Sequence, residues 1–445
     1  MASDLLTIAA SGTRAARVAL DITAQNIANA STEGYVRRSV TLADLTSPNA
    51  RASYGDVSQY GVRVVGIERN VDSFLQAEVR RTGSDATRAD TLVTGLGNIA
   101  DAVEQSNLYP AIVDFHKALT HLTSAPTDSS LRAAAVESAR TMAQSFNVAA
   151  QSLNAAKAGL QFEAGDNVTQ VNTLSTSLAR LNLQIASDTN PQNNQATLLD
   201  QRDSILQQLS QYGDITTSFG TNNTVTVQMG GASGPQLVSG GTANVLAMTT
   251  AANGTVAFTL GGSSMTLAGG SLAGHQQALT AAATTSATLD GIANALISAA
   301  NTAQGNGVAL NGTTGQPLFS GSNAGTMALA LTSGSQLATA PAGAGSNSQN
   351  PGNLTALQTA LSTSDIAGQT NALLFTVSAA VNGNSTTRDA LDAIAANAKT
   401  ALSSQSGVSL DTEAANLLRF QQAFQASGKV MQVASTLFDT LLGIR

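Results

Sequence analysis

Residues 409–442 have the sequence SLDTEAANLLRFQQAFQASGKVMQVASTLFDTLL, in which apolar side chains recur in alternating steps of three and four. The recurring positions are Leu410, Leu417, Phe420, Phe424, Met431, Ala434, Phe438 and Leu441. This spacing is typical of a coiled-coil seam about four heptads long. Ser409 or Asp411 can cap the start of the helix by accepting backbone N–H bonds. We therefore predict one long C-terminal helix with a narrow apolar stripe.

A matching stripe lies at the other end of the chain. Its positions are Leu5, Ile8, Gly12, Ala15, Ala19 and Ile22, again three or four residues apart. This pattern predicts a helix over residues 2–30. The helix is expected to stop near Asn29, because residues 29–34 (NASTEG) concentrate turn-forming side chains and end in a glycine that can adopt a positive φ.

Each terminal stripe needs a cover, because a single helix with an exposed apolar seam is unstable alone in water. The other terminus is the obvious partner. Gly12, Ala15 and Ala19 are small enough to let two backbones come close, whereas Phe420 and Phe424 are bulky and project well past a partner. Two interpretations stay equally open: a bundle within one chain, and packing between subunits.

The middle of the chain alternates between segments with helical periodicity and segments with β periodicity. Extended segments are predicted over residues 35–45 and 61–71, and helices over 72–209 with interruptions at 107–110, 124–129 and 190–191. Alternating β segments divided by Gly-rich turns fill 212–268. Helix is predicted again over 272–301 and 353–404, with an irregular or β segment at 305–345 between them.

These elements predict a mainly α protein with an inserted β domain. Three domains are expected: a terminal coiled-coil core (1–34 with 405–445), a helical bundle with an extended β arm (35–211 with 269–404), and the small β-rich outer domain (212–268).

Composition restricts the classes of partner. Only 11% of the 445 residues are charged, against roughly 25% in a typical soluble domain, and the formal net charge is −7. Such a chain offers no positive field for nucleic acid. No run of 18 apolar residues predicts membrane insertion, no cleaved secretory signal is evident, and there is no cysteine to form disulfides or thiolate sites.

No pattern of catalytic or metal-binding residues is evident, so no enzyme activity, cofactor or metal is expected. His116 and His121 are five residues apart, which on a helix turns them about 140° away from each other, unlike a zinc-binding pair. Asp200 and Asp203 share a helix face with Arg202 between them, which favours a solvated, salt-bridged surface over paired catalytic acids.

Both ends resemble the bacterial flagellar axial family of rod, hook and hook-associated proteins. The resemblance lies in residues 20–37 (LDITAQNIANASTEGYVR) and in 407–442. Inside the chain, residues 198–203 (LLDQRD), 270–274 (GSLAG) and 310–319 (LNGTTGQPLF) are similar to the hook-associated members at the junction of hook and filament. The β segment 212–268 is the least similar part and is short for the family.

The resemblance implies a structural adaptor that joins the flagellar hook to the filament through terminal-helix packing and ring assembly. Its implied partners are the hook protein, the second junction protein (hook-associated protein 3), further copies of itself, and an export chaperone at the C-terminal helix. The implied location is extracellular, at the distal end of the hook, after type III export. The alternatives are a hook or rod subunit and, from another class, a secreted hydrolase carried on the flagellum.

The resemblance also implies which residues pack in the tubular core of the assembly. They are Leu5, Ile8, Ala15, Ala19, Ile22, Asn26, Asn29, Gly34, Tyr35, Leu417, Phe420, Phe424, Met431, Phe438 and Leu441. Without it, a plain helix stop explains the cluster of Asn26, Asn29, Gly34 and Tyr35 about as well as a subunit contact does.

Overall fold

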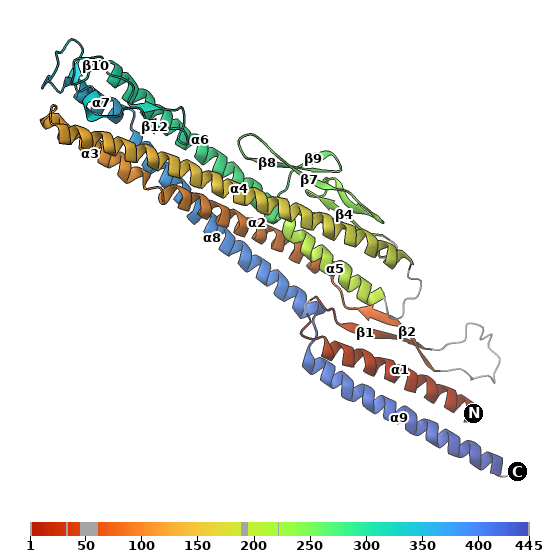
Figure 1. The fold of residues 1–445 in the computed structure, drawn as a ribbon. Helices are drawn as coiled ribbons and strands as arrows, with labels where there is room; N and C mark the ends of the chain where they lie inside the picture. The colour runs from red at the N-terminus through yellow and green to blue at the C-terminus, as the bar shows by residue number, and fades with distance from the viewer. Residues whose placement is uncertain (1, 33, 45–60, 188–194, 221, 444–445) are drawn as a thin grey trace. The chain divides into compact units, whose positions relative to one another are not determined.

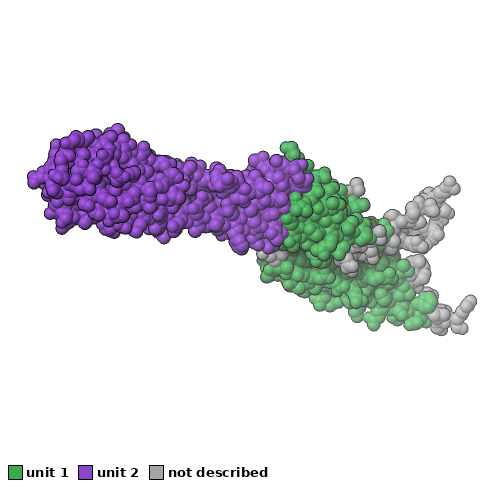
Figure 2. All heavy atoms as spheres, turned by 45° about the horizontal axis from the view of Figure 1, so that its top comes forward, with its two compact units in different colours: residues 1–84, 171–245, 392–445 green, residues 85–170, 246–391 purple. Residues whose placement is uncertain are grey.

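The computed structural model describes residues 2–32, 34–44, 61–187, 195–220 and 222–443 (Figure 1). Contacts divide the chain into two compact units, coloured separately in Figure 2. Unit 1 comprises residues 1–84, 171–245 and 392–445, and unit 2 comprises residues 85–170 and 246–391.

Helices make up most of the described chain, as predicted. They are α1 (Ala2–Ala28), α2 (Ser73–Glu104), α3 (Leu108–Ser124), α4 (Ser129–Ser187), α5 (Gln195–Tyr212), α6 (Gly270–Gly305), α7 (Gly352–Thr363), α8 (Ile366–Ser406) and α9 (Leu410–Gly443), with a short 3-10 helix η1 (Gly334–Gln336). Among the described residues, no helix is long and apolar enough to cross a membrane. The predicted mainly α fold class is confirmed.

Two helix breaks come from residues that tolerate left-handed backbone. The predicted interruption near 107 falls at Asn107, whose φ is 50°. Residues 353–404 are helical as predicted, except for a break that was not predicted between α7 and α8 at Asp365, whose φ is 45°. Asn and Asp adopt this conformation more readily than other non-glycine residues, because their short polar side chains bond locally.

All the strands of the described residues pair antiparallel. They are β1 (Arg38–Asp44), β2 (Val62–Arg69), β3 (Ile215–Phe219), β4 (Val225–Met229), β5 (Gln236–Ser239), β6 (Thr242–Ala243), β7 (Leu246–Thr250), β8 (Val256–Leu260), β9 (Ser263–Met265), β10 (Gly307–Val308), β11 (Phe319–Ser320), β12 (Ala328–Leu329) and β13 (Ala340–Pro341). Strands β1 and β2 lie in the two segments predicted to be extended and pair as an antiparallel hairpin, with a register shift between Thr41 and Leu42. The β10–β13 and β11–β12 pairs lie in the segment predicted to be irregular or β.

The inserted β region consists of two separate sheets. One has the order β3-β4-β5-β6 and the other β7-β8-β9. The first sheet belongs to unit 1 and the second to unit 2. The strands themselves are where the alternation predicted them, and the division of the whole chain into three domains stays a prediction.

Outside the terminal helices, unit 1 buries apolar side chains of its four-stranded sheet and of α5. Val225, Val227 and Met229 alternate along β4 and are buried, while Leu206 and Leu209 of α5 are buried as well. Alternation with a period of two places these β4 side chains on one face of the sheet.

Unit 2 contains a buried arginine that pairs with no carboxylate in the described part of the chain. Arg132, at the start of α4, is 1% exposed. Its guanidinium donates to the carbonyls of Pro126, Gly334, Ser335 and Leu337, and to Thr339 Oγ1 at 3.0 Å. Burial lowers the pKa of Arg132 below its ordinary value. Since a buried cation must be satisfied by hydrogen bonds, these acceptors tie the η1 loop to α4.

The substitution Arg132→Ala should destabilise the protein by about 3 kcal/mol or more, because it leaves several buried acceptors without a hydrogen-bond donor. The measurement is urea unfolding followed by circular dichroism. Arg140→Ala on the same helix is the matched control: its side chain is exposed and pairs only with Glu137, so its cost should be below about 0.5 kcal/mol. Equal costs for the two variants would contradict the anchoring role of Arg132.

Candidate subunit-packing site

Helices α1 and α9 lie side by side and run antiparallel in unit 1 (Figure 1). Ala15, Ala19 and Ile22 of α1 are buried. A Cβ atom built on Gly12 would lie 2.9 Å from Ser427 Oγ, so the two backbones approach closely at this point. The pairing of the two termini within one chain, left open by the pattern, is therefore present.

One register accounts for two contacts of the pair. Asn26 Nδ2 donates to Glu413 Oε2 at 3.1 Å, and Gly12 faces Ser427. Asn26 follows Gly12 by the same fourteen positions by which Ser427 follows Glu413. Fourteen residues are two heptads, so both contacts belong to one uninterrupted seam.

The same register brings large side chains of α9 opposite small ones of α1. By position, Ala15 lies opposite Phe424, and Ala19 opposite Phe420. Small residues on one helix leave room for aromatic rings from the other, which is why the α1 stripe consists mostly of Ala and Gly. Bulky α9 side chains are therefore partly accommodated by the chain's own N-terminal helix.

Not all of the predicted packing residues are covered by this pairing. Leu417, Phe420 and Met431 are half-buried, while Leu5, Ile8, Phe424 and Phe438 are exposed. Asn29 and Tyr35 are half-buried, and Gly34 is exposed with a φ of 78° that suits glycine at this turn. The side chain of Leu441 lies outside what the structure describes.

Asn26 is the polar centre of the predicted cluster. It is 1% exposed and uses its amide fully. Its Oδ1 accepts from Tyr35 Oη at 2.9 Å and from the Arg38 backbone N–H at 3.0 Å, and its Nδ2 donates to the Arg38 carbonyl at 2.8 Å and to Glu413. Asn29 instead closes the helix end, donating to the Gln25 carbonyl at 2.9 Å.

A plain helix stop, one of the two explanations of this cluster, accounts for Asn29 but not for Asn26, which bonds to Arg38 and Glu413. Glu413, which is buried on α9, was not predicted. The missed signal is spacing: Glu413 lies four residues before Leu417, at the next seam position of the α9 stripe. A charged residue at a seam position indicates a buried polar partner.

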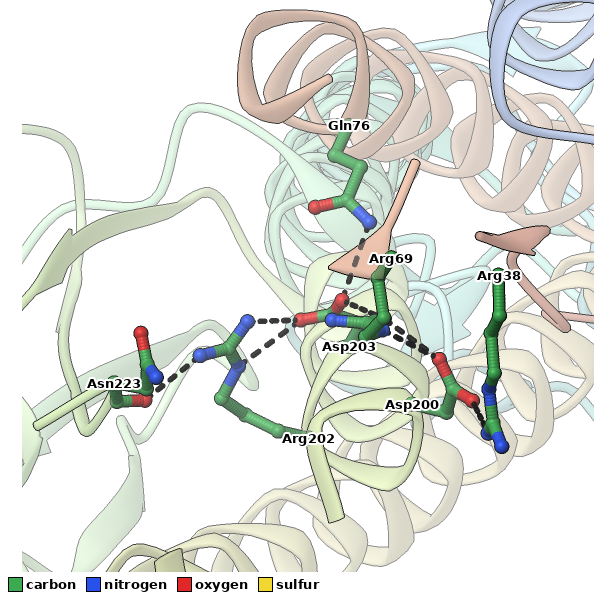
Figure 3. Close-up of polar contacts among 7 residues, drawn as sticks. All are labelled: Arg38, Arg69, Gln76, Asp200, Arg202, Asp203 and Asn223. Atoms are coloured by element: carbon green, nitrogen blue, oxygen red, sulfur yellow. Dashed lines mark hydrogen bonds and ion pairs between the residues drawn. The ribbon is translucent and has the colours of Figure 1, made fainter. Parts of the chain in front are cut away.

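A chain of alternating charges continues from Arg38 (Figure 3). Arg38 Nη2 pairs with Asp200 Oδ2 at 2.7 Å, and Arg69 Nη2 bridges Asp200 and Asp203, at 2.7 Å from each. Arg202 Nη2 pairs with Asp203 Oδ1 at 2.8 Å. These bonds join the β1–β2 hairpin to α5.

The structure corrects the expectation of a solvated face at Asp200 and Asp203. Their side chains are only 16% and 10% exposed, so the salt bridges are there but mostly withdrawn from water. The cause is the hairpin, which brings Arg38 and Arg69 over α5 from 131 or more residues away in the sequence. Local spacing along α5 carries no information about such partners.

The electrostatics of the cluster follow from this burial. Burial by itself raises the pKa of Asp203, but Arg202 and Arg69 outweigh it, so the pKa lies below its ordinary value. Burial raises the pKa of the Tyr35 phenol, and the carboxylates of Asp200 and Glu413 add to this against the effect of Arg38. Tyr35 therefore stays protonated at neutral pH, and its O–H donates a hydrogen bond to Asn26 Oδ1.

The outward side of α9 carries a second apolar stripe. Leu418, Val433 and Leu437 are 59%, 57% and 48% exposed, and Val430 is exposed as well. The stripe predicted from the sequence is the seam that faces α1, and this second stripe was not predicted, although Val430, Val433 and Leu437 are spaced by three and four. Because α9 is apolar on two sides and α1 packs against one of them, the other side stays exposed.

The other candidate chemistry lies in unit 2. His116 and His121 line a pocket of about 450 Å³ between α3, α7 and the start of α8, together with Lys117 and Asp365. Within the described residues, no group of three or more His, Cys, Asp or Glu side chains is placed to hold a metal ion.

Asp203→Asn should destabilise the folded protein by about 3 kcal/mol at pH 7, because it leaves buried arginines underneutralised. Since the pKa of Asp203 is lower in the folded state than in the unfolded chain, its ionised form stabilises the fold above the unfolded pKa, and this is lost as pH falls through the folded pKa. The difference from wild type should therefore shrink only below about pH 4.

Urea unfolding at a series of pH values measures this difference. Glu137→Gln is the control, because Glu137 is largely exposed and pairs only with Arg140 at the surface. A difference between wild type and Asp203→Asn that stays constant down to pH 2 would refute the assigned role of the Asp203 charge.

Family models match three parts of the chain. The flagellar hook-associated protein FlgK helical domain matches residues 94–319, just over half of the 445 residues. The flagella basal body rod protein model matches residues 6–35, and the flagellar basal body rod FlgEFG protein C-terminal model matches residues 400–444. The two end models thus cover most of the α1–α9 pair.

Curated proteins named flagellar hook-associated protein 1 are similar to the chain. That of Bacillus subtilis (strain 168) is 30% identical over 213 residues, covering 46% of this chain and 42% of that protein. That of Salmonella typhimurium is 29% identical over 249 residues, 55% of this chain and 44% of that protein. The chain thus matches less than half the length of these relatives.

A solved structure, titled as the flagellar hook junction protein FlgK from Burkholderia pseudomallei, is 25% identical with a TM-score of 0.49, covering 55% of this chain and 46% of that one. On the family model that matches over half of its length, the chain belongs to the flagellar hook-associated protein FlgK family.

Proposed function

We propose that the chain is a non-enzymatic adaptor subunit that joins the flagellar hook to the filament, outside the cell at the distal end of the hook. The observation that carries this proposal is the exposed apolar stripe on α9, on the side away from the seam that α1 partly covers. Apolar stripes of this kind gain stability only when a further surface covers them.

The partners that fit this stripe are other helical termini of the same kind. We infer that copies of the chain form a ring through it, in contact with the hook protein on one side and with hook-associated protein 3 on the other. Before assembly, an export chaperone bound at α9 would cover the stripe, since the free stripe favours aggregation. All four partners are part of the proposal.

A hook or rod subunit is the competing proposal, because rod-protein models match both ends. The interior favours the adaptor, since the hook-associated model covers residues 94–319. Labelling the protein on intact flagella distinguishes the two. A single spot at the distal end of the hook supports the adaptor, and label along the whole hook or along the rod rejects it.

The triple variant Leu418→Ser, Val433→Ser and Leu437→Ser should keep its helix content but lose binding to isolated hook ends by at least about tenfold. Each of these side chains, once buried, contributes about 1.5–3 kcal/mol, so their combined loss exceeds that factor. Binding is measured by counting labelled protein on hook ends in electron micrographs, and helix content by circular dichroism.

The matched control is Phe162→Ser with Phe375→Ser, which removes two apolar side chains that are 79% and 72% exposed in unit 2. This control should bind hook ends like wild type. Full binding by the α9 triple variant would reject assembly through the outward stripe.

A further inference from the structure

Two polar residues continue the apolar seams of the terminal pair. Asn26 lies four residues after Ile22 on α1, and Glu413 lies four residues before Leu417 on α9, so both occupy positions where the repeat calls for apolar side chains. They are 1% and 3% exposed and bond to each other at 3.1 Å. A polar pair buried in a coiled-coil seam is a known device for selecting one register over others.

We propose that Asn26 and Glu413 form a polar pin that sets the antiparallel register of α1 against α9. The pin thereby determines where the outward apolar side chains of α9 lie along α1. The register itself does not depend on the proposed function, whereas its relevance for assembly rests on that function.

On the α1 side, hydrogen bonds fix the orientation of the Asn26 amide. Tyr35 Oη, the Arg38 backbone N–H and the Arg38 carbonyl hold the Asn26 amide through three hydrogen bonds within the N-terminal segment. These bonds aim the remaining N–H of Nδ2 at the seam, where Glu413 Oε2 accepts it. A donor held in place by other bonds is selective, because it cannot turn to find a different acceptor.

A slip by one heptad removes this match. In one direction, Asn26 would face Phe420 in place of Glu413, and Glu413 would have no amide donor opposite it. Both groups are buried, so the slipped pair leaves a polar donor and a charge without partners. The other seam positions favour the observed register less strongly. The same slip brings Ala19 opposite Ser427, and this leaves no charged group without a partner.

Cysteine pairs can report the register, because the chain contains no cysteine of its own. Gly12→Cys with Ser427→Cys reports the observed register: a Cβ built on Gly12 lies 3.7 Å from Ser427 Cβ, inside the range of about 3.5–4.5 Å for disulfides. Gly12→Cys with Ala434→Cys reports the slip by one heptad. Both pairs are equilibrated in a glutathione redox buffer at low protein concentration, and the intramolecular disulfides are quantified by peptide mapping.

Asn26→Leu with Glu413→Leu removes the pin while keeping the seam apolar. The ratio of the 12–427 to the 12–434 disulfide should fall by at least about tenfold, which corresponds to one charge-assisted hydrogen bond. Glu413→Gln keeps an acceptor oxygen and should change the ratio less than about threefold. Ile22→Val, a neighbouring seam change without polar groups, is the matched control and should leave the ratio unchanged.

An unchanged ratio in the double Leu variant overturns the proposal, since the apolar layers or the link from α8 to α9 would then set the register. Loss of both disulfides in that variant overturns it too, because the polar pair would then provide pairing strength and not register. Hook-end binding is scored separately: lost binding with an unchanged ratio refutes the pin alone, whereas a changed ratio with full binding counts against the proposed function.

Discussion

The antiparallel pairing of α1 with α9 is the constraint on which the rest of unit 1 depends. Small residues along α1 let the two backbones approach, as the contact of Gly12 with Ser427 shows. At the end of the pair, Asn26 bonds both to Glu413 and to the backbone of Arg38, where β1 begins. The position of the β1–β2 hairpin thus follows from the position of α9.

Arg38 also begins the series of buried salt bridges that connects the β1–β2 hairpin to α5. Ionic groups withdrawn from water are costly unless every charge has a partner, and the alternation of arginine and aspartate from Arg38 to Arg202 provides one at each step. In unit 2, the buried Arg132 donates instead to carbonyls and one hydroxyl, and it pairs with no carboxylate of the described residues. In both cases the buried charges connect segments that lie far apart in the sequence.

The ends and the interior of the chain match different family models, and they differ in packing as well. The two ends match models of rod proteins, and they are the segments that form the α1–α9 pair. The interior matches the hook-associated helical domain. Shared ends suit a common mode of assembly, while the interior distinguishes one axial protein from another. The outward stripe of α9 is therefore the surface through which we expect the common mode to act.

The sequence by itself determined the helices, the two terminal seams and the strands, because periods of 3.6 and 2 are local properties of the chain. It missed the break at Asp365, where one residue in a left-handed conformation interrupts an otherwise helical pattern. Only the tertiary structure decided that the seams pair within one chain, that Leu418 and Val433 face outward, and that Asp200 and Asp203 are buried. Those outcomes depend on partners more than a hundred residues away, such as Arg69 for Asp203 and Glu413 for Asn26, which no local period can reveal.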